Sequence, residues 1–242
     1  MISIVGKNGA GKSTFAKVLC GFIKEDSGSI YYNGENIANK TIKERAEIIG
    51  FVMQNPNQMI TKNIVFDEIA LGLKLRGISN NEIEERVKRI ASICGLSPFL
   101  NWPVSALSYG QKKRVTIASI LVLNPQIIIL DEPTAGQDYK HYSEIMDFLL
   151  EINLLGTTII LITHDMHLML EYTDRTIVLS DGEIIADDKP SVILTDKEVI
   201  RKANLKETSL YTLSQMIGIE DETKFVQNFI NYERSVRSVN AK

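Results

Sequence analysis

The chain carries, almost at its start, the stretch Gly6-Lys7-Asn8-Gly9-Ala10-Gly11-Lys12-Ser13. This stretch fits the pattern GxxxxGK[ST], in which glycines let backbone N–H groups turn toward phosphate oxygens that a Cβ would keep away. A β-rich run from Ile2 to Val5 precedes it, and apolar residues at helical spacing follow it. The helix that begins near Lys12 directs the positive end of its dipole toward the same anion. The sequence therefore predicts a phosphate-binding loop between a strand and a helix.

The loop is expected to bind a nucleotide together with Mg²⁺. Lys12 is expected to reach the β- and γ-phosphates, and the Ser13 hydroxyl is expected to hold Mg²⁺. A glycine-rich turn that binds nothing is the alternative, and the strand-to-helix setting argues against it. The predicted nucleotide-binding residues of the loop and the first helical turn are Gly6, Asn8, Gly9, Ala10, Gly11, Lys12, Ser13 and Thr14.

The bulk composition is that of an ordinary folded protein with one sizeable core. Of the 242 residues 44% are apolar and 24% are charged, and the formal net charge is −3. Because nucleic-acid binding needs clustered positive charge, we expect no nucleic acid among the partners. No apolar stretch approaches the ~20 residues that cross a bilayer, and we find no signal peptide, which predicts a soluble cytoplasmic protein. The cysteines, Cys20 and Cys94, lack metal-ligand spacing and are expected to be small buried apolar side chains.

Runs rich in β-branched residues predict the strands of a buried, parallel sheet. They lie at residues 48–53, 126–130 and 157–162. The last two are apolar without alternation, which suits strands covered on both faces, and a helical pattern near 141–152 separates them. Tight hairpins are expected at Asn33-Gly34 and Asp181-Gly182, because these residue types tolerate positive φ.

The region between about residues 55 and 123 has a helical texture. Ser79 begins a helix with the spacing of a capping box, in which Glu82 reaches back to the first turn. An apolar face follows at helical spacing, and Gly95 ends the helix. Residues beyond Pro190 show short helical patterns, so a small folded appendage is expected there.

Two acids stand at the carboxyl end of the predicted strand 127–130. In an open α/β sheet this end is where ligands bind, and Asp131 and Glu132 follow it directly. Asp131 is expected to hold Mg²⁺, directly or through water, and Glu132 to polarise the water that attacks phosphorus in line. The alternative is that the acids cap a helix before Pro133-Thr134, and the presence of the phosphate loop favours the catalytic interpretation.

His164 follows the predicted strand 157–162. A lone histidine at a strand end is more often structural than catalytic. This strand is expected to neighbour the one that ends at Asp131, so a contact between His164 and the γ-phosphate is the favoured interpretation.

A set of motifs in one order resembles the ATP-binding cassette (ABC) ATPases, which are P-loop NTPases of the RecA-like type. Leu107-Ser108-Tyr109-Gly110-Gln111 is similar to the ABC signature, usually LSGGQ, and precedes the strand that ends at Asp131. Gln54 matches the family's Q-loop glutamine, and His164 matches its switch histidine. Its Walker B ending and its D-loop are similar to Asp131-Glu132-Pro133-Thr134 and Ala135-Gly136-Gln137-Asp138. The resemblance extends from residue 1 to about residue 190.

This resemblance implies an α/β fold with a mostly parallel sheet core, an inserted α-helical subdomain and an antiparallel β portion. The implied divisions are an ABC ATPase domain over 1–190, with the helical subdomain at about 55–123, and a small helical C-terminal extension over 191–242. ATP and Mg²⁺ are the implied cofactors. The implied catalytic residues are Glu132, His164 and Gln54, and the implied ligands of Mg²⁺ are Ser13, Gln54 and Asp131.

The signature segment supplies a second predicted anion site. Ser108 and the N–H groups of Gly110 and Gln111 lie at the start of an expected helix. In ABC proteins this site closes over the γ-phosphate of the ATP held by the opposite subunit, and Asp138 of the D-loop belongs to the same ATP-binding set. The resemblance therefore implies a head-to-tail dimer of cassettes with two nucleotides between them.

Finer features resemble the ATPases of energy-coupling factor (ECF) transporters. They lie in the stretches 54–58, 67–72 and 131–136. ECF transporters import vitamins and transition-metal ions, and their paired ATPases act on a transmembrane coupling subunit that also holds a substrate-binding membrane protein. The resemblance implies these partners and a peripheral place at the cytoplasmic face of the cell membrane.

The sequence leaves three alternatives to an ECF-type ATPase. The first is an ABC ATPase of another transporter subfamily, and the second is one that acts on DNA or ribosomes. The segment before the signature is too short for a long coiled coil, and no basic linker is present. The third alternative is a subunit that binds nucleotide without hydrolysis, and the retained Glu132, His164 and Gln54 argue against it.

The chain departs from the family pattern at three places. Tyr109 replaces a signature glycine, and Gln137 replaces the usual D-loop leucine. Family members also carry two strands and an adenine-stacking aromatic before the phosphate loop, which this sequence lacks. We therefore expect the sequence to be either truncated or one cassette of a longer protein with two.

Overall fold

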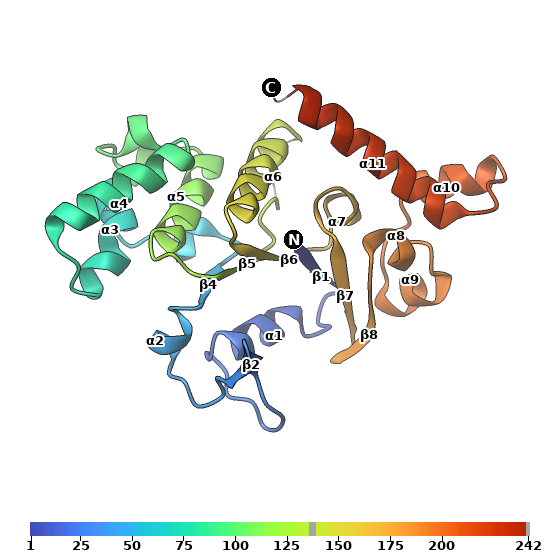
Figure 1. Cartoon of the computed structure of the whole chain (residues 1–242), viewed down its shortest axis with the longest axis horizontal. Helices are drawn as coiled ribbons and strands as arrows, with labels where there is room; N and C mark the ends of the chain where they lie inside the picture. Colours follow the sequence, from blue (N-terminus) through green and yellow to red (C-terminus); the bar gives the residue numbers. More distant parts are fainter. Residues whose placement is uncertain (136–138, 241–242) are drawn as a thin grey trace. The chain divides into compact units, whose positions relative to one another are not determined.

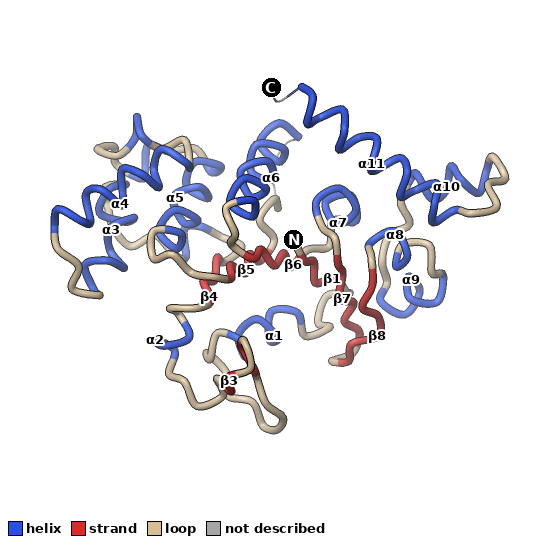
Figure 2. Tube along the Cα trace, in the orientation of Figure 1, coloured by secondary structure: helices blue, strands red, loops and turns tan. Residues whose placement is uncertain are grey.

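The computed structural model describes residues 1–135 and 139–240, with the side chains of 1–135 and 142–236. The structure is mixed α/β, as predicted (Figures 1 and 2), and most of its strands belong to one mostly parallel six-stranded sheet. The order in this sheet is β4 (Ile49–Val52), β5 (Ile127–Asp131), β6 (Thr158–Ile162), β1 (Ile2–Val5), β7 (Arg175–Ser180) and β8 (Glu183–Asp188). Among the described residues, no helix combines the length and the apolar character that a membrane span requires.

The chain divides into two compact units. The first comprises residues 1–13 and 160–242, and the second comprises residues 14–159. The helices that follow residue 190 belong to the same unit as β1, β7 and β8. The predicted division into a domain over 1–190 and an extension over 191–242 stays a prediction.

The sheet of the first unit is built around β1. This strand pairs in parallel with β6 and with β7, so that Ile4 lies opposite both Ile162 and Ile177. β8 pairs antiparallel to β7 through a turn at Asp181-Gly182, whose φ values are 52° and 86°. The strands β2 (Tyr31–Tyr32) and β3 (Glu35–Asn36) pair in the same way through Asn33-Gly34, at 48° and 83°. Both predicted hairpins are confirmed.

Helices complete the first unit and share its apolar core. They are α7 (Met166–Tyr172), α8 (Pro190–Ile193), α9 (Lys197–Ala203), α10 (Ser209–Met216) and α11 (Glu222–Asn240). The core contains Val5 and Val178 from the strands, Met169 from α7, and Leu194 and Val226 from beyond Pro190. The short helical patterns near the end of the sequence are therefore helices that bury apolar side chains against β1 and β7.

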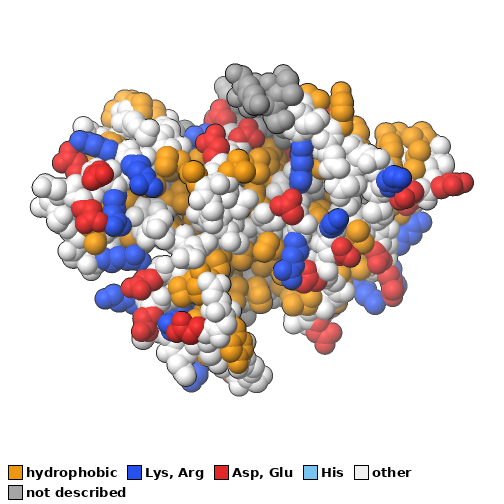
Figure 3. Space-filling model, viewed as in Figure 1, with side chains coloured by type: hydrophobic (Ala, Val, Ile, Leu, Met, Phe, Trp, Pro, Cys, Tyr) orange, Lys and Arg blue, Asp and Glu red, His pale blue; other side chains and the backbone are white. Residues whose placement is uncertain are grey.

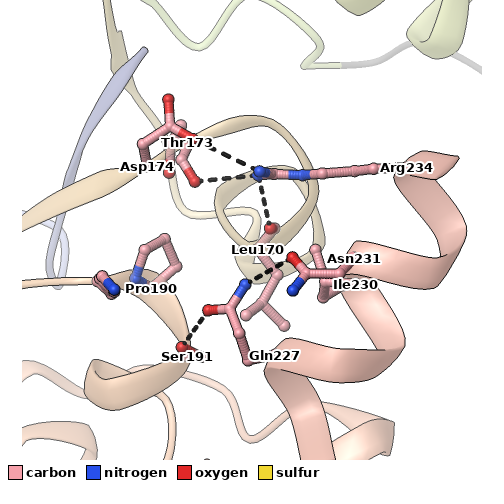
Figure 4. A pocket seen from close by; sticks show the side chains of 10 residues that line it. Leu170, Thr173, Asp174, Pro190, Ser191, Gln227, Ile230, Asn231 and Arg234 are labelled. Atoms are coloured by element: carbon pink, nitrogen blue, oxygen red, sulfur yellow. Dashed lines mark hydrogen bonds and ion pairs between the residues drawn. The ribbon is translucent and has the colours of Figure 1, made fainter. Parts of the chain in front are cut away.

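The last helix is tied to α7 beside a pocket of about 260 Å³ (Figure 4). Arg234 of α11 donates hydrogen bonds to the backbone carbonyls of Leu170, Glu171 and Thr173, and it pairs with Asp174. The last carbonyls of a helix accept no hydrogen bond from an N–H group within the helix. Arg234 satisfies them at the end of α7, and this bond set fixes the middle of α11 to that helix.

In the second unit a buried arginine closes the end of α1 (Lys12–Leu19), a helix that begins in the first unit. Arg45, at the end of α2 (Ile42–Arg45), is 2% exposed. Its guanidinium donates to the carbonyls of Val18, Leu19 and Ala38 at 2.8, 3.2 and 2.8 Å. Two of these carbonyls belong to the last residues of α1, so Arg45 satisfies backbone groups that the helix itself leaves without a partner.

The region between residues 55 and 123 is helical, as predicted. Its elements are η1 (Pro56–Gln58), α3 (Val65–Leu75), α4 (Asn80–Ile93), η2 (Ser97–Phe99), η3 (Val104–Ala106) and α5 (Tyr109–Leu121). The long helices pack on one another through fully buried residues such as Ile69, Val87 and Ile117. Their exposed faces carry acidic and basic side chains side by side (Figure 3), several of them in ion pairs. The helix α6 (Tyr139–Leu154) follows β5.

The predicted capping box at the start of α4 is only half formed. The Ser79 hydroxyl accepts a hydrogen bond from the backbone N–H of Glu82, as expected. The Glu82 carboxylate, however, pairs with Arg86 one turn further on. A charged donor at this helical spacing competes successfully with a neutral backbone N–H. Gly95, with φ of 66°, follows the end of the helix as predicted.

The two cysteines are free thiols in buried positions. Burial raises the pKa of Cys20 to about 11 and the pKa of Cys94 to about 12. Both thiols are neutral at physiological pH, which agrees with their interpretation as small apolar side chains.

The role of Arg45 can be tested by replacing it with methionine. Arg45→Met removes the donors of three carbonyls and keeps an apolar stem, so the free energy of unfolding should fall by about 3 kcal/mol. Urea unfolding followed by circular dichroism measures the change. Arg86→Met breaks only an exposed ion pair and should cost less than about 1 kcal/mol. Equal losses in the two variants would contradict the proposed role of Arg45.

Candidate functional site

The predicted phosphate loop is a tight turn between β1 and α1. Gly6, Gly9 and Gly11 have φ values of 147°, 80° and 99°, which are conformations that favour glycine. At Gly6 the requirement is also steric, because a Cβ there would lie 2.1 Å from the carbonyl oxygen of Leu179. The loop therefore lies directly against the end of β7.

Lys12 turns its side chain into this loop. It is 9% exposed, and its ammonium group donates to the carbonyl oxygens of Gly6 and Lys7 at 2.7 and 3.1 Å. The loop is closed further by a bond from the N–H of Ala10 to the carbonyl of Lys7. Two backbone carbonyls of the loop thus hold the Lys12 ammonium group inside the turn.

The first turn of α1 completes the anion site. The first N–H groups of a helix have no acceptor within the helix, and the dipole gives this end a partial positive charge. Ser13 and Thr14 lie in this turn and are exposed, as are Asn8 and Gly9 of the loop, whereas Ala10 is buried. A helix N-terminus, a lysine and a hydroxyl together suit a phosphate group.

His164 lies at the corner between β6 and α7 and is exposed. The corner is fixed by a bond from the N–H of Asp165 to the Thr163 hydroxyl at 3.0 Å. The Asp165 carboxylate then caps α7 by accepting from the N–H groups of His167 and Leu168. Because β6 pairs in parallel with β1, His164 and the phosphate loop leave neighbouring strands at the same end of the sheet.

Asp131 and Glu132 occupy the end of β5 in the second unit, and both are half-buried. Glu132 has a φ of 46°, a left-handed conformation that is unusual for a residue with a side chain and is frequent at functional sites. The residues that follow, Pro133 and Thr134, form a turn and do not begin a helix. The alternative interpretation of the acid pair as a helix N-cap is therefore wrong.

The signature segment forms the start of α5. Ser108 is the N-cap residue, and its hydroxyl accepts from the N–H of Gln111, whose side-chain oxygen in turn accepts from the N–H of Ser108. The predicted anion site included the N–H of Gln111, which in this structure donates to Ser108. A pocket of about 210 Å³ opens at this helix start, lined in part by Ser108, Gly110, Gln111 and Arg114.

Gln54 follows β4 and is exposed. β4 and β5 pair in parallel with Val52 opposite Leu130, so Gln54 and the acid pair leave neighbouring strands at the same end. The ammonium group of Lys113, on α5, donates to the carbonyls of Met53 and Gln54 at 2.9 and 2.8 Å.

Lys113 is a residue of this site that sequence reasoning missed. Burial lowers the pKa of Lys113 to about 8, and the negative charges of Asp131 and Glu132 act in the opposite direction. The sequence carries one signal for it, because Lys113 shares a helical face with the buried Thr116 and Ile117. A lysine on an apolar face needs an acceptor, but the sequence does not say which one.

The predicted site residues fall into two sets. The phosphate loop and His164 belong to the first unit, and Gln54, Asp131, Glu132 and the signature segment belong to the second. Asp138 lies outside the described residues. Within each set, parallel pairing brings the loops to one end of the strands, where ligands bind in open α/β sheets.

Comparison with known families decides the assignment. The profile described as ABC transporter matches residues 1–135, which is more than half of the chain of 242 residues. The chain belongs to the ABC transporter family. It therefore carries an ABC ATPase domain, of a family of ATP-hydrolysing enzymes, and the predicted P-loop NTPase fold is confirmed by solved structures of that family.

Curated relatives and solved structures of ABC proteins resemble the chain over most of its length. Proteins named as ABC transporter ATP-binding proteins in Clostridium perfringens and Enterococcus faecalis are 64% and 62% identical over 98% of this chain. The chain spans 42% of the length of each. The structure of cbiO1 from Clostridium perfringens, part of the ABC transporter complex cbiONQ, is 37% identical to this chain with a TM-score of 0.76. The match covers 90% of this chain and 87% of the cbiO1 chain. MJ1267, an ATP-binding cassette of an ABC transporter in its ADP conformation, is 29% identical with a TM-score of 0.75, and that match covers 83% of this chain and 86% of the MJ1267 chain.

The steric role of Gly6 in the ABC cassette gives a prediction. Gly6→Ala places a methyl group against the Leu179 carbonyl, so the free energy of unfolding should fall by more than about 2 kcal/mol even without nucleotide. Gly9→Ala meets no atom within 4 Å and should cost only the backbone strain of about 1 kcal/mol. Urea unfolding of the two variants measures both. A Gly6→Ala protein as stable as Gly9→Ala would show that the loop does not lie against β7.

Proposed function

We propose that this chain is the ATP-binding and ATP-hydrolysing cassette of a membrane transporter, of the ECF importer type. The observation that carries the proposal is the loop around Lys12. Lys12 is 9% exposed, and its ammonium group lies within the turn, where it donates to the carbonyls of Gly6 and Lys7. A phosphate oxygen is a charged acceptor and binds an ammonium group more strongly than a neutral carbonyl does. The β- and γ-phosphates of ATP are the ligands that fit this loop and the start of α1.

The proposal also includes Mg²⁺, bound together with ATP. Among the described residues, no group of three or more His, Cys, Asp or Glu side chains could hold a metal ion by itself. Mg²⁺ prefers a few protein oxygens together with phosphate oxygens and water, rather than a cage of protein ligands. Ser13, Asp131 and Gln54 offer a hydroxyl, a carboxylate and an amide oxygen of this kind. Bound Mg²⁺ would neutralise charge on the phosphates.

The roles of the remaining residues follow from hydrolysis in line with the leaving group. Glu132, held in its left-handed conformation at the end of β5, orients and deprotonates the attacking water. His164, on the exposed corner after β6, contacts the γ-phosphate, and Gln54 aligns water and Mg²⁺ from the end of β4. The main work of such a site is positioning and charge neutralisation.

A second cassette completes each ATP site in this proposal. The N-terminus of α5, with the Ser108 hydroxyl and the N–H of Gly110, closes over the γ-phosphate held by the phosphate loop of the partner. Gln111 holds Ser108 in place through the capping box. The pocket at this helix start, about 210 Å³, supports access by a ligand that comes from outside the chain. The result is a head-to-tail dimer with two ATP molecules.

The transporter context rests on resemblance. The cbiO1 protein to which the chain is similar is part of the ABC transporter complex cbiONQ, and the motifs around Gln54 and Asp131 resemble ECF ATPases. We infer a transmembrane coupling subunit and a substrate-binding membrane protein as partners, at the cytoplasmic face of the membrane. The cargo is a vitamin or a transition-metal ion. Residues 1–190 form the ATPase domain, and 191–242 form an extension packed on it.

The base assignment is tested by Glu132→Gln in the full-length protein. The amide cannot take a proton from water, so turnover should fall by about 100-fold or more while ATP binding persists. Steady-state phosphate release and size-exclusion chromatography with ATP measure the loss and the accumulation of a nucleotide-bound dimer. Glu151→Gln, at an exposed position of α6, is the control and should turn over normally. Normal turnover in Glu132→Gln would remove Glu132 as the base.

The dimer is tested by mixing two inactive variants. Lys12→Ala disables the phosphate loop, and Ser108→Arg blocks the helix start that serves the partner. A mixed dimer contains one site with both elements intact, so mixing should restore ATPase activity to about a quarter of the wild-type rate. Phosphate release before and after mixing measures this. A mixture as inactive as its components would contradict a site shared between cassettes.

A further inference from the structure

The first turns of α5 hold the backbone beside Gln54. Lys113 is 1% exposed, and its ammonium group donates to the carbonyls of Met53 and Gln54 at 2.9 and 2.8 Å. A buried ammonium group is stable only where acceptors satisfy it. Both acceptors here belong to the Gln54 segment, defined as Met53 and Gln54, so the position of that segment depends on Lys113.

Tyr109 adds a second donor from the same helix. Its hydroxyl donates to the carbonyl of Gln54 at 3.3 Å, and it lies one helical turn before Lys113, on the same face of α5. The Gln54 carbonyl therefore accepts from both residues. At this position the ABC signature usually has glycine, which has no side-chain donor.

The Gln54 segment leaves β4 and also lies beside the end of β5 that carries the two acids, Asp131 and Glu132. These two carboxylates are the acidic groups whose charge acts on Lys113. Lys113, on the helix that begins after Ser108, therefore bonds to the Gln54 segment and also lies within the electrostatic influence of Asp131 and Glu132.

We propose that Lys113 and Tyr109 are positioning residues that hold the Gln54 segment to the start of α5. They act through Gln54 and do not touch the substrate. The inference rests on the proposed function, in which Gln54 aligns Mg²⁺ and water while Ser108 contacts the nucleotide of the partner. A shift of α5 on closure of the dimer then moves Gln54 with it, so closure and alignment of the catalytic water occur together.

The test replaces Lys113 by methionine in the full-length protein. Groups that orient a metal ligand from behind typically contribute 10- to 100-fold to activity, so kcat should fall by about that factor. The phosphate loop is untouched, so KM for ATP should stay within about twofold. Hydrogen–deuterium exchange without nucleotide should rise in the peptide that contains residues 53–55 and stay unchanged in α3 and α4.

Matched variants separate positioning from folding. Lys113→Arg can donate to both carbonyls and should recover most of the kcat. Tyr109→Phe removes one donor and should show the same localised exchange with a smaller loss of kcat. Lys112→Met, at the neighbouring half-buried position, should leave kcat and exchange unchanged. If Lys113→Met does not fold, Lys113→Arg and Tyr109→Phe still decide the question.

Two outcomes would overturn the inference. One is wild-type kcat and wild-type exchange at residues 53–55 in both Lys113→Met and Tyr109→Phe. The other is a rise in exchange over the whole chain, which would mean a general loss of stability. A wild-type protein that fails to hydrolyse ATP would instead refute the proposed function, and the exchange measurement, made without nucleotide, would still report on the contact.

Discussion

A lysine ammonium group enclosed by its own backbone loop is the interaction on which the candidate site depends. Lys12 binds the carbonyls of Gly6 and Lys7 because a charge removed from water must find acceptors. The turn that supplies these carbonyls can lie against the end of β7 only because Gly6 has no Cβ, which would collide with the Leu179 carbonyl. The Lys12 ammonium group thereby lies in the turn that precedes α1, where we propose that a phosphate group binds.

Parallel strands turn this local arrangement into a site. β1 and β6 pair in register, so the loop and His164 leave the sheet at one end, and β4 and β5 do the same for Gln54 and the acids. A parallel sheet thus collects at one end groups that are far apart in the sequence. Side chains then hold the loops at this end in position. The Asp165 carboxylate caps α7, and the Lys113 ammonium group donates hydrogen bonds to the carbonyls of Met53 and Gln54.

The sequence was sufficient where a local pattern has one physical solution. The phosphate loop, the hairpins at Asn33-Gly34 and Asp181-Gly182, and the helical texture between 55 and 123 are of this kind, because glycine conformation and apolar spacing decide them locally. It was insufficient where long-range partners decide. Glu82 pairs with Arg86 and not with a backbone N–H group of the first turn. Arg234 donates to carbonyls of a helix about 60 residues earlier in the chain, and Lys113 donates to carbonyls about 60 residues earlier, so no local pattern indicates either partner. The roles of Glu132, His164 and Asp138 stay predictions.

The proposed activity requires that the loop around Lys12 bind the phosphates of Mg-ATP. Isothermal titration calorimetry of the full-length protein tests it most directly, with ATP added in the presence and absence of Mg²⁺ and to the variants Lys12→Met and Lys17→Met. We predict that binding strengthens with Mg²⁺ and weakens by about 100-fold or more in Lys12→Met, where a charged bond to phosphate is lost. Binding should be unchanged in Lys17→Met, because Lys17 lies on the exposed face of the same helix. A wild-type protein without affinity for Mg-ATP, or a Lys12→Met variant that binds as tightly, would contradict it.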